Sequence, residues 1–228
     1  MSGDVLALVR LLQLASPALP IGAYSYSQGL EWMIDRRTVR DAATAGAWIG
    51  DVLAHVIAQG EAPVLWRLLD AASGRDTQRF AEWNAWYRAS RESRELRAET
   101  EQMGASLIQL ATDLGVLDEV AARMARDATP VTLPAAFALA AAALSIPAEA
   151  ALTGYLASWL ENQVLAAVKA LPLGQVAGQR LLHALGARLP EVVAQAKTLA
   201  DDDIASFAPG LALASAFHET QYSRLFRS

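Results

Sequence analysis

The amino-acid sequence predicts an all-α protein, and three observations support this fold class. Proline and glycine divide the chain into segments whose apolar residues recur at helical spacing, and no segment alternates as a strand would. Hydrophobic residues make up 54% of the 228 residues and charged residues 19%, which is enough apolar surface for a sizeable core. No long linker divides the chain, so we predict a single domain, residues 1–228, built as a helical bundle of about ten helices.

The N-terminal half contains six of the predicted helices. The first covers residues 4–14 and ends at Ser16-Pro17, because proline disfavours the helical conformation in the residue before it. A loop at 16–25 follows, and its two prolines and Gly22 fix the backbone path. Further helices are predicted over residues 27–35, 41–59, 61–73, 78–88 and 90–114. The second of these has an aspartate N-cap, and the third has a proline in its first turn.

The segment 128–148 carries no charge over about the length that a lipid bilayer requires. Pro134 and Pro147, however, limit its helical core to residues 135–146, which is too short to span a membrane. We therefore predict a buried helix in this segment.

Residues 149–171 give the clearest helical pattern in the chain. The faces outside its main apolar stripe hold mostly small uncharged residues, and such a helix lies at the centre of a bundle or is shared between subunits. Helices are then predicted over residues 175–189 and 191–199. A last helix is predicted to begin near Ile204, with the aspartate triplet 201–203 as its N-terminal cap.

Composition excludes several function classes. The net charge of −5 and the pI near 5.2 argue against a nucleic-acid partner, because such binding needs a positive surface. The chain has no cysteine, and its three histidines, His55, His183 and His218, are far apart, so we predict no tightly bound metal and no other cofactor. The N-terminus lacks the pattern of a signal peptide, which predicts a cytoplasmic protein.

The sequence also lacks the short motifs that carry catalysis. It has no phosphate-binding glycine-rich loop, no His-Glu-x-x-His, no nucleophile elbow and no dinucleotide fingerprint. We therefore predict that the protein is not an enzyme. Two alternatives stay open at this point: an all-α enzyme whose polar site assembles from distant residues, and a membrane-associated helical protein.

The C-terminal segment 218–228 has an unusual composition for a chain end. Large apolar side chains alternate there with Arg224 and Arg227, whereas chain ends usually carry small polar residues. Aromatic and arginine side chains are enriched at protein interfaces, so we predict a tail that docks on a partner. The alternative is a tail that folds back onto its own domain.

Four stretches of the chain resemble the urease accessory protein UreF family, in the same order. They are Leu12-Gln-Leu-Ala-Ser-Pro-Ala-Leu-Pro-Ile-Gly-Ala-Tyr-Ser-Tyr-Ser-Gln-Gly-Leu-Glu31, Arg91-Glu-Ser-Arg-Glu-Leu-Arg-Ala-Glu-Thr-Glu-Gln-Met-Gly104, Lys169-Ala-Leu-Pro-Leu-Gly-Gln175 and His218-Glu-Thr-Gln-Tyr-Ser-Arg-Leu-Phe-Arg-Ser228. The resemblance spans nearly the whole chain, although no single stretch is a chemical signature.

The resemblance implies an all-helical homodimer that acts as an assembly chaperone. Proteins of this family form a complex with UreD, also called UreH, and with the GTPase UreG, and this complex delivers nickel to the urease apoprotein. The implied role is a scaffold that links UreD to UreG and modulates GTP hydrolysis, with nickel handled by the complex rather than held by this chain. Neither a membrane nor a nucleic acid is expected as a partner.

The resemblance also implies which residues make the contacts. The partner-binding residues are then Tyr24, Glu31, Lys169, Tyr222, Arg224, Leu225 and Phe226. The first three, together with Arg224, would face the GTPase, and the tail would become ordered against UreD. Arg224 resembles an arginine finger that acts on a phosphoryl group, and the alternative is simple pairing with acidic residues of UreD. The implied dimer surface is the helix 152–168, where Thr153, Gly154 and Ala157 permit close approach.

Overall fold

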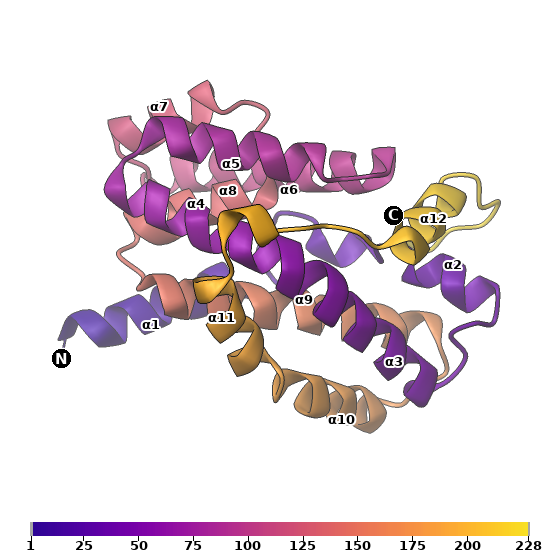
Figure 1. Ribbon diagram of the computed structural model, residues 1–228. Coiled ribbons are helices and arrows are strands. Elements are labelled where there is room, and N and C mark those ends of the chain that lie inside the picture. Colours follow the sequence, from indigo (N-terminus) through magenta and orange to yellow (C-terminus); the bar gives the residue numbers. More distant parts are fainter. Residues whose placement is uncertain (1, 228) are drawn as a thin grey trace.

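The computed structural model describes residues 2–227, with side chains from Val5 onward, and every regular element in that range is helical (Figure 1). The α-helices are α1 (Ser2–Leu14), α2 (Leu30–Asp35), α3 (Ala42–Val52), α4 (Ala62–Gly74), α5 (Thr77–Ala89), α6 (Arg94–Asp113), α7 (Glu119–Asp127), α8 (Leu133–Ala143), α9 (Ala148–Ala170), α10 (Gln175–Gly186), α11 (Leu189–Thr198) and α12 (Pro209–His218). A π-helix, η2 (Leu53–Glu61), joins α3 to α4, and short 3-10 turns form η1 (Ala23–Ser25) and η3 (Asp201–Asp203). The predicted all-α class is confirmed.

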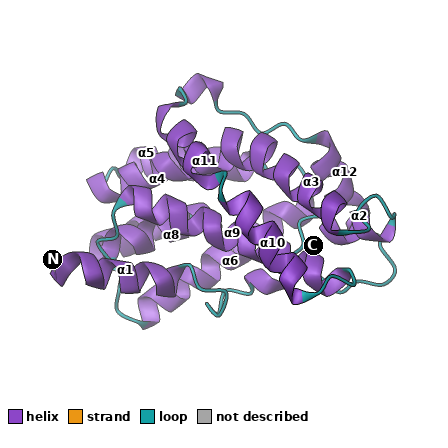
Figure 2. Ribbon diagram, turned by 90° about the horizontal axis from the view of Figure 1, so that it is seen from below, coloured by secondary structure: helices purple, strands orange, loops and turns teal. Residues whose placement is uncertain are grey.

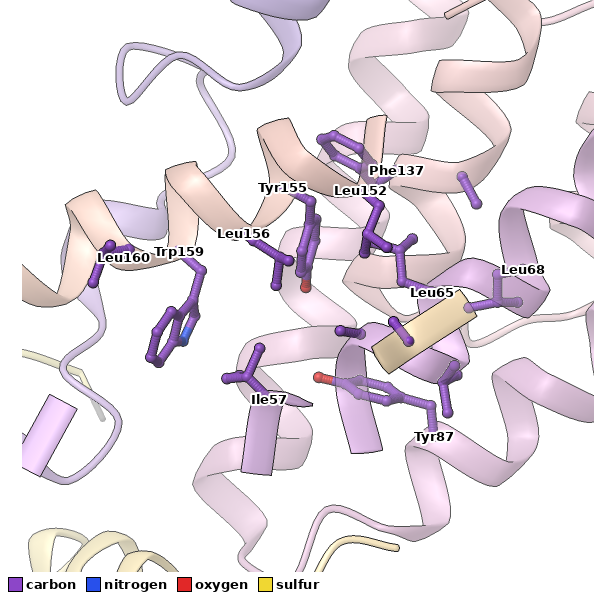
Figure 3. Packing of buried hydrophobic residues seen from close by; sticks show 14 of the residues in the cluster. Ile57, Leu65, Leu68, Tyr87, Phe137, Leu152, Tyr155, Leu156, Trp159 and Leu160 are labelled. Atoms are coloured by element: carbon purple, nitrogen blue, oxygen red, sulfur yellow. The ribbon is translucent and has the colours of Figure 1, made fainter. Parts of the chain in front are cut away.

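Helix α9 lies at the centre of the bundle. Helices α1, α3, α4, α8, α10 and α11 pack around it (Figures 1 and 2). Leu152, Leu156 and Leu160 on its main stripe are fully buried, and Figure 3 shows them facing the core. Of the two positions predicted for this helix from its uncharged faces, the structure shows the one at the centre of the bundle.

Helix α8 is the buried helix predicted from the uncharged segment. Ala135, Ala136, Ala138 and Ala141 are fully buried, and their small side chains let α8 pack closely against α4 and α6. Among the described residues, no helix has the length and apolar character needed to cross a membrane.

Aspartate and serine side chains set several helix starts. The predicted N-cap Asp41 accepts from the Thr44 amide at 2.8 Å, while the Thr44 hydroxyl oxygen accepts from the Asp41 amide at 3.1 Å. This reciprocal pair is a capping box, and it confirms the predicted start of α3. Ser93 caps α6 with a single bond, since its hydroxyl accepts from the Leu96 amide at 3.0 Å, and the helix starts at Arg94 instead of the predicted residue 90.

The predicted break between residues 59 and 61 is wrong. Helix α3, the π-helix η2 and α4 run on without interruption, and Pro63 sits within the continuous helix. A Cβ atom built on Gly60 would lie 2.9 Å from the Ala205 carbonyl oxygen. The missing side chain of Gly60 therefore lets the segment at Ala205 lie against the helix, where the Gln59 carbonyl accepts from the Ala205 amide at 3.1 Å.

The predicted last helix is also wrong. The aspartate triplet forms the turn η3, and α12 begins at Pro209. The reason is tertiary, because Asp201 accepts from Arg67 Nε at 2.9 Å and Arg67 Nη1 donates to the Ala196 carbonyl at 2.7 Å. The triplet thus anchors an ion pair instead of capping a helix. Helix α7 was not predicted.

Candidate functional site

The loop before α2 positions Glu31 at the start of a helix. Gln28 and Gly29 both adopt left-handed backbone conformations, with φ of 53° and 80°, so α2 begins at Leu30 rather than at the predicted residue 27. A Cβ atom on Gly29 would lie 3.0 Å from Ala214 Cβ of α12. Glycine at this position therefore lets α12, and the tail that follows it, pack against α2.

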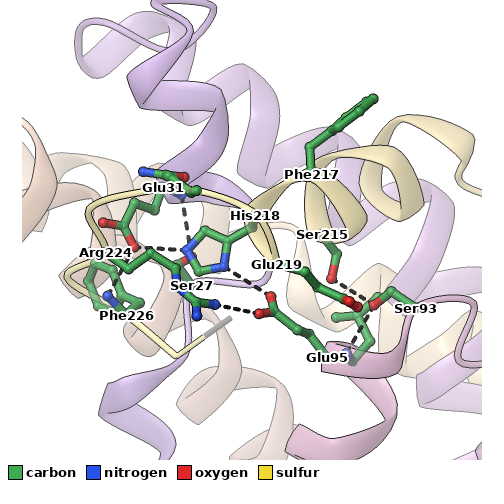
Figure 4. A network of polar contacts seen from close by, with 12 residues as sticks. Ser27, Glu31, Ser93, Glu95, Ser215, Phe217, His218, Glu219, Arg224 and Phe226 are labelled. Carbon is green, nitrogen blue, oxygen red and sulfur yellow. Dashed lines mark hydrogen bonds and ion pairs between the residues drawn. The ribbon is translucent and has the colours of Figure 1, made fainter.

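The carboxylate of Glu31 binds the C-terminal tail. Oε1 accepts from the Leu225 amide at 2.6 Å, and Oε2 accepts from the Phe226 amide at 2.9 Å. His218 Nε2 lies 3.0 Å from the same Oε2 (Figure 4). Glu31 is only 9% exposed, so its charge is stabilised mainly by these groups.

His218 connects the tail to a second carboxylate. Its ring is fully buried, and Nδ1 lies 3.0 Å from Glu95 Oε2, opposite the contact to Glu31. A protonated ring donates at both nitrogens, which matches these two carboxylate partners. Arg224 Nη1 donates to Glu95 Oε1 at 2.7 Å, so Arg224 is held within its own chain. From the sequence, His218 is an isolated histidine at the start of the C-terminal segment, and Glu95 belongs to the polar face of a helix. Both gain their roles here through contacts distant in sequence.

Lys169 and Tyr24 complete this surface. Lys169 Nζ lies 5.7 Å from the centre of the Tyr24 ring and 5.9 Å from that of the Phe226 ring, both within cation–π range. Phe226 is buried, whereas Tyr24 is 61% exposed. The fold therefore brings together the residues that the resemblance assigned to the GTPase, because the tail bridges the first loop, α2 and the end of α9.

The tail itself packs on its own domain in this structure. Phe226 joins the hydrophobic core, and the Arg227 amide donates to the Ser25 carbonyl at 2.7 Å. Tyr222 is fully exposed and Leu225 is 63% exposed, so two of its large side chains face solvent. We name the surface formed by Tyr24, Glu31, Lys169 and residues 222–227 the tail surface. Docking of this tail on a partner stays a prediction.

The residues predicted for the dimer lie elsewhere on α9. Thr153 and Ala157 are exposed, while Gly154 lies under α1, since a Cβ atom there would be 2.6 Å from Leu11 Cδ1. The outer face of α1 is itself apolar and more than half exposed at Val5, Leu8, Val9 and Leu12. Helix α1 therefore packs on α9 at Gly154, which lies between the two exposed α9 residues in sequence, and α1 adds an exposed apolar face of its own.

Glu61, Tyr87, Arg91 and Tyr155 form a buried ionic centre that was not predicted from the sequence. Glu61, at the end of η2, accepts from the Tyr155 hydroxyl at 2.5 Å and from the Tyr87 hydroxyl at 2.6 Å. Arg91 Nη1 lies 3.5 Å from the same carboxylate. All four residues are buried, and Figure 3 shows both tyrosine rings within the core. The only sequence signal was a glutamate within a mostly apolar segment, and its partners come from α5, from the connection after α5 and from α9. In residues 2–227, no three His, Asp or Glu side chains gather to hold a metal ion.

The two tyrosines predict a loss of stability at high pH. Burial raises the pKa of Tyr87 and Tyr155 well above the ordinary value of 10.0, and the neighbouring Glu61 carboxylate raises it further. The folded state therefore keeps its protons longer than the unfolded chain, so this contribution to stability is complete below about pH 10 and is lost as the pH rises toward the folded pKa values. We expect the free energy of unfolding, measured by urea denaturation above about pH 10, to fall more steeply for the wild type than for a Tyr87→Phe/Tyr155→Phe variant. Equal slopes would contradict this origin.

Comparison with known proteins identifies the family. The family model of UreF matches residues 39–186, which is more than half of the chain. The chain belongs to the UreF family. The urease accessory protein UreF of Azoarcus sp. (strain BH72) is 55% identical over 230 residues, covering 100% of this chain and 98% of that relative. The corresponding UreF of Janthinobacterium sp. (strain Marseille) is 55% identical over 223 residues, covering 97% and 98%.

A third relative joins two proteins in one chain. The bifunctional urease accessory protein UreEF of Bordetella bronchiseptica is 50% identical over 228 residues, which is 99% of this chain but only 53% of that relative. The Azoarcus and Janthinobacterium relatives match nearly the full length of the chain, so the similarity extends beyond residues 39–186 to the loop before α2 and to the tail. The UreF family thus covers all the elements that build the tail surface.

Proposed function

We propose that this chain is a urease maturation chaperone, a scaffold that links UreD to the GTPase UreG and modulates GTP hydrolysis during nickel insertion into apo-urease. Membership of the UreF family supports the role in urease maturation, as do the names of the relatives, which are urease accessory proteins. On this proposal the chain works in the cytoplasm, handles no tightly bound cofactor of its own and catalyses no reaction itself.

One observation carries the assignment of the contact surface. The Glu31 carboxylate holds the Leu225 and Phe226 amides, and this places Arg224 and Lys169 on the same side of the molecule as Tyr24. The exposed Lys169 ammonium beside an exposed tyrosine suits a protein partner with an acidic group at the contact, and Arg224 would have to exchange Glu95 for such a group. Within this tail surface, we assign Tyr24, Glu31, Lys169 and Arg224 to UreG, and the exposed Tyr222 and Leu225 to UreD.

Truncation of the tail tests this assignment. A cut after Phe217 would also remove the fully buried His218, so a cut after Gln221 is the cleaner change. We expect the full chain, co-expressed with UreD and UreG, to retain both partners on co-purification, and the truncated chain to lose them. Since Phe226 belongs to the core, a circular dichroism melt should show a lower Tm for the truncated chain. Retention of both partners by the truncated chain would contradict the assignment.

The proposed homodimer gives a separate prediction. Ala157→Asp places a charge on the exposed apolar surface of α9 and α1, and we expect it to yield a monomer by light scattering that no longer recruits the GTPase. The matched control is Ala85→Asp, at an exposed alanine of α5, which should keep the dimer. An unchanged dimer in the Ala157 variant would contradict the proposed interface.

The Bordetella relative suggests one more partner. Its name, UreEF, joins UreE and UreF in one chain, so in that protein the two are held together. We therefore include a UreE-type protein among the proposed partners. Co-purification of this chain with a separately expressed UreE would test that contact.

A further inference from the structure

The bundle contains a cavity of about 70 Å³ beside the buried ionic centre. Its lining includes apolar side chains, at Met103, Phe137 and Trp159, and charged ones, at Glu61, Arg91 and Glu99. The π-helix η2 ends at Glu61 in this lining, and π-helical turns occur often at functional sites. The proposed function uses none of these residues.

Arg91 has a donor that the protein does not satisfy. Its Nη2 donates to Ser90 Oγ at 3.2 Å and Ser206 Oγ at 3.3 Å, and its Nη1 faces Glu61. Its Nε is buried and has no hydrogen-bond partner among residues 2–227. A buried charged donor without an acceptor is costly, so an acceptor in the adjoining cavity would stabilise the folded protein.

The charges around the cavity restrict what it can bind. Two buried carboxylates, Glu61 and Glu99, stand against one guanidinium group, and this balance repels an anion. Glu61 already accepts from two hydroxyls, and Glu99 accepts from Gln28 Nε2 at 2.8 Å. With no cluster of three metal-binding side chains in the described part of the chain, a metal ion is also disfavoured.

Size gives the last restriction. A water molecule needs about 10–15 Å³ of cavity volume, and an apolar cavity of about 150 Å³ in another protein binds benzene. A cavity of about 70 Å³ therefore holds a few waters or one molecule with a few non-hydrogen atoms. The mixed polar and apolar walls suit a small molecule with one strong acceptor.

We propose that this cavity is a binding site for a small uncharged molecule whose oxygen accepts a hydrogen bond from Arg91 Nε. Water and a small amide share this chemistry, since each combines an acceptor oxygen with donors for the carboxylates. Occupancy completes the ionic centre. The cavity also adjoins Gln28 of the loop before α2, which donates to Glu99 at 2.8 Å and accepts from Trp159 Nε1 at 2.9 Å.

High-resolution crystal structures of the full-length chain test the proposal, one native and one soaked in formamide. We expect an ordered oxygen within hydrogen-bond distance of Arg91 Nε in the native crystal. Replacement of that oxygen by formamide would identify amides as the ligand source, and its persistence would identify water. An empty cavity would overturn the proposal, as would an anion or metal ion identified by anomalous scattering.

Two variants give an independent readout. Arg91→Lys keeps the positive charge but removes the Nε donor, so the ordered oxygen should be lost from that position. Ser158→Leu fills the cavity from α9 without changing the ion pair. Displacing a bound molecule should lower Tm by about 2–4 °C, whereas filling an empty cavity would raise it. A raised Tm in the Ser158 variant would therefore overturn the proposal even if the Arg91 variant fails to fold.

Discussion

Replacing Glu31 with alanine is expected to release the C-terminal tail and abolish retention of the proposed UreG partner. The change leaves two backbone amides and the buried His218 without their shared acceptor. Removing one partner of a buried charged network costs about 3–5 kcal/mol. The tail is a short terminal segment, so we expect local detachment rather than global unfolding.

Hydrogen exchange and co-purification measure the two parts of this prediction. The Leu225 and Phe226 amides should exchange much faster in Glu31→Ala than in the wild type, and UreG should be lost from the purified complex. Glu92→Ala is the matched control, because that carboxylate is exposed and lies close in sequence to the Ser93 cap. A variant that keeps slow exchange at both amides would show that Glu31 does not hold the tail.

Most of the fold could be predicted because its signals are local. Apolar spacing, proline positions and the Asp41 cap act within a few residues, and they predicted the class and the buried helix α8 correctly. Two of the wrong boundaries, at Gly60 and at the aspartate triplet, arise from partners distant in sequence. Ala205 needs the space at Gly60, and Arg67 takes Asp201 as an ion-pair partner. Local propensity does not encode either contact.

In the candidate site, too, local signals could be predicted and contacts between distant residues could not. Composition singled out the tail, and the resemblance supplied Tyr24, Glu31 and Lys169, which the structure brings close to it. The parts that sequence reasoning missed are the groups that join them. His218 becomes a bridge only when α12 packs on α2 and α6, and the Glu61 centre exists only when η2, the end of α5 and α9 meet.

Replacing Glu61 with alanine is expected to give the largest loss of global stability. Tyr87 and Tyr155 would keep buried hydroxyls without their acceptor, and Arg91 would lose a buried counter-charge. We expect the free energy of unfolding to fall by about 3–5 kcal/mol in urea denaturation. Glu61→Gln keeps an acceptor oxygen and should cost less, about 1–3 kcal/mol. Glu82→Ala, at an exposed position of α5, should change stability by less than about 0.5 kcal/mol.

A double-mutant cycle separates the ion pair from simple cavity formation. Glu61→Leu alone leaves Arg91 charged and unpaired, and Arg91→Met alone leaves Glu61 in the same state. Changing both removes the two buried charges together, so the combined loss of stability should be smaller than the sum of the single losses by about 0.5–3 kcal/mol. Additive losses would indicate that each side chain stabilises the core by packing alone. A combined loss smaller than the sum would instead show that the Glu61 and Arg91 charges stabilise the fold as a pair. Two apolar residues at these positions would then destabilise the protein less than one unpaired charge does.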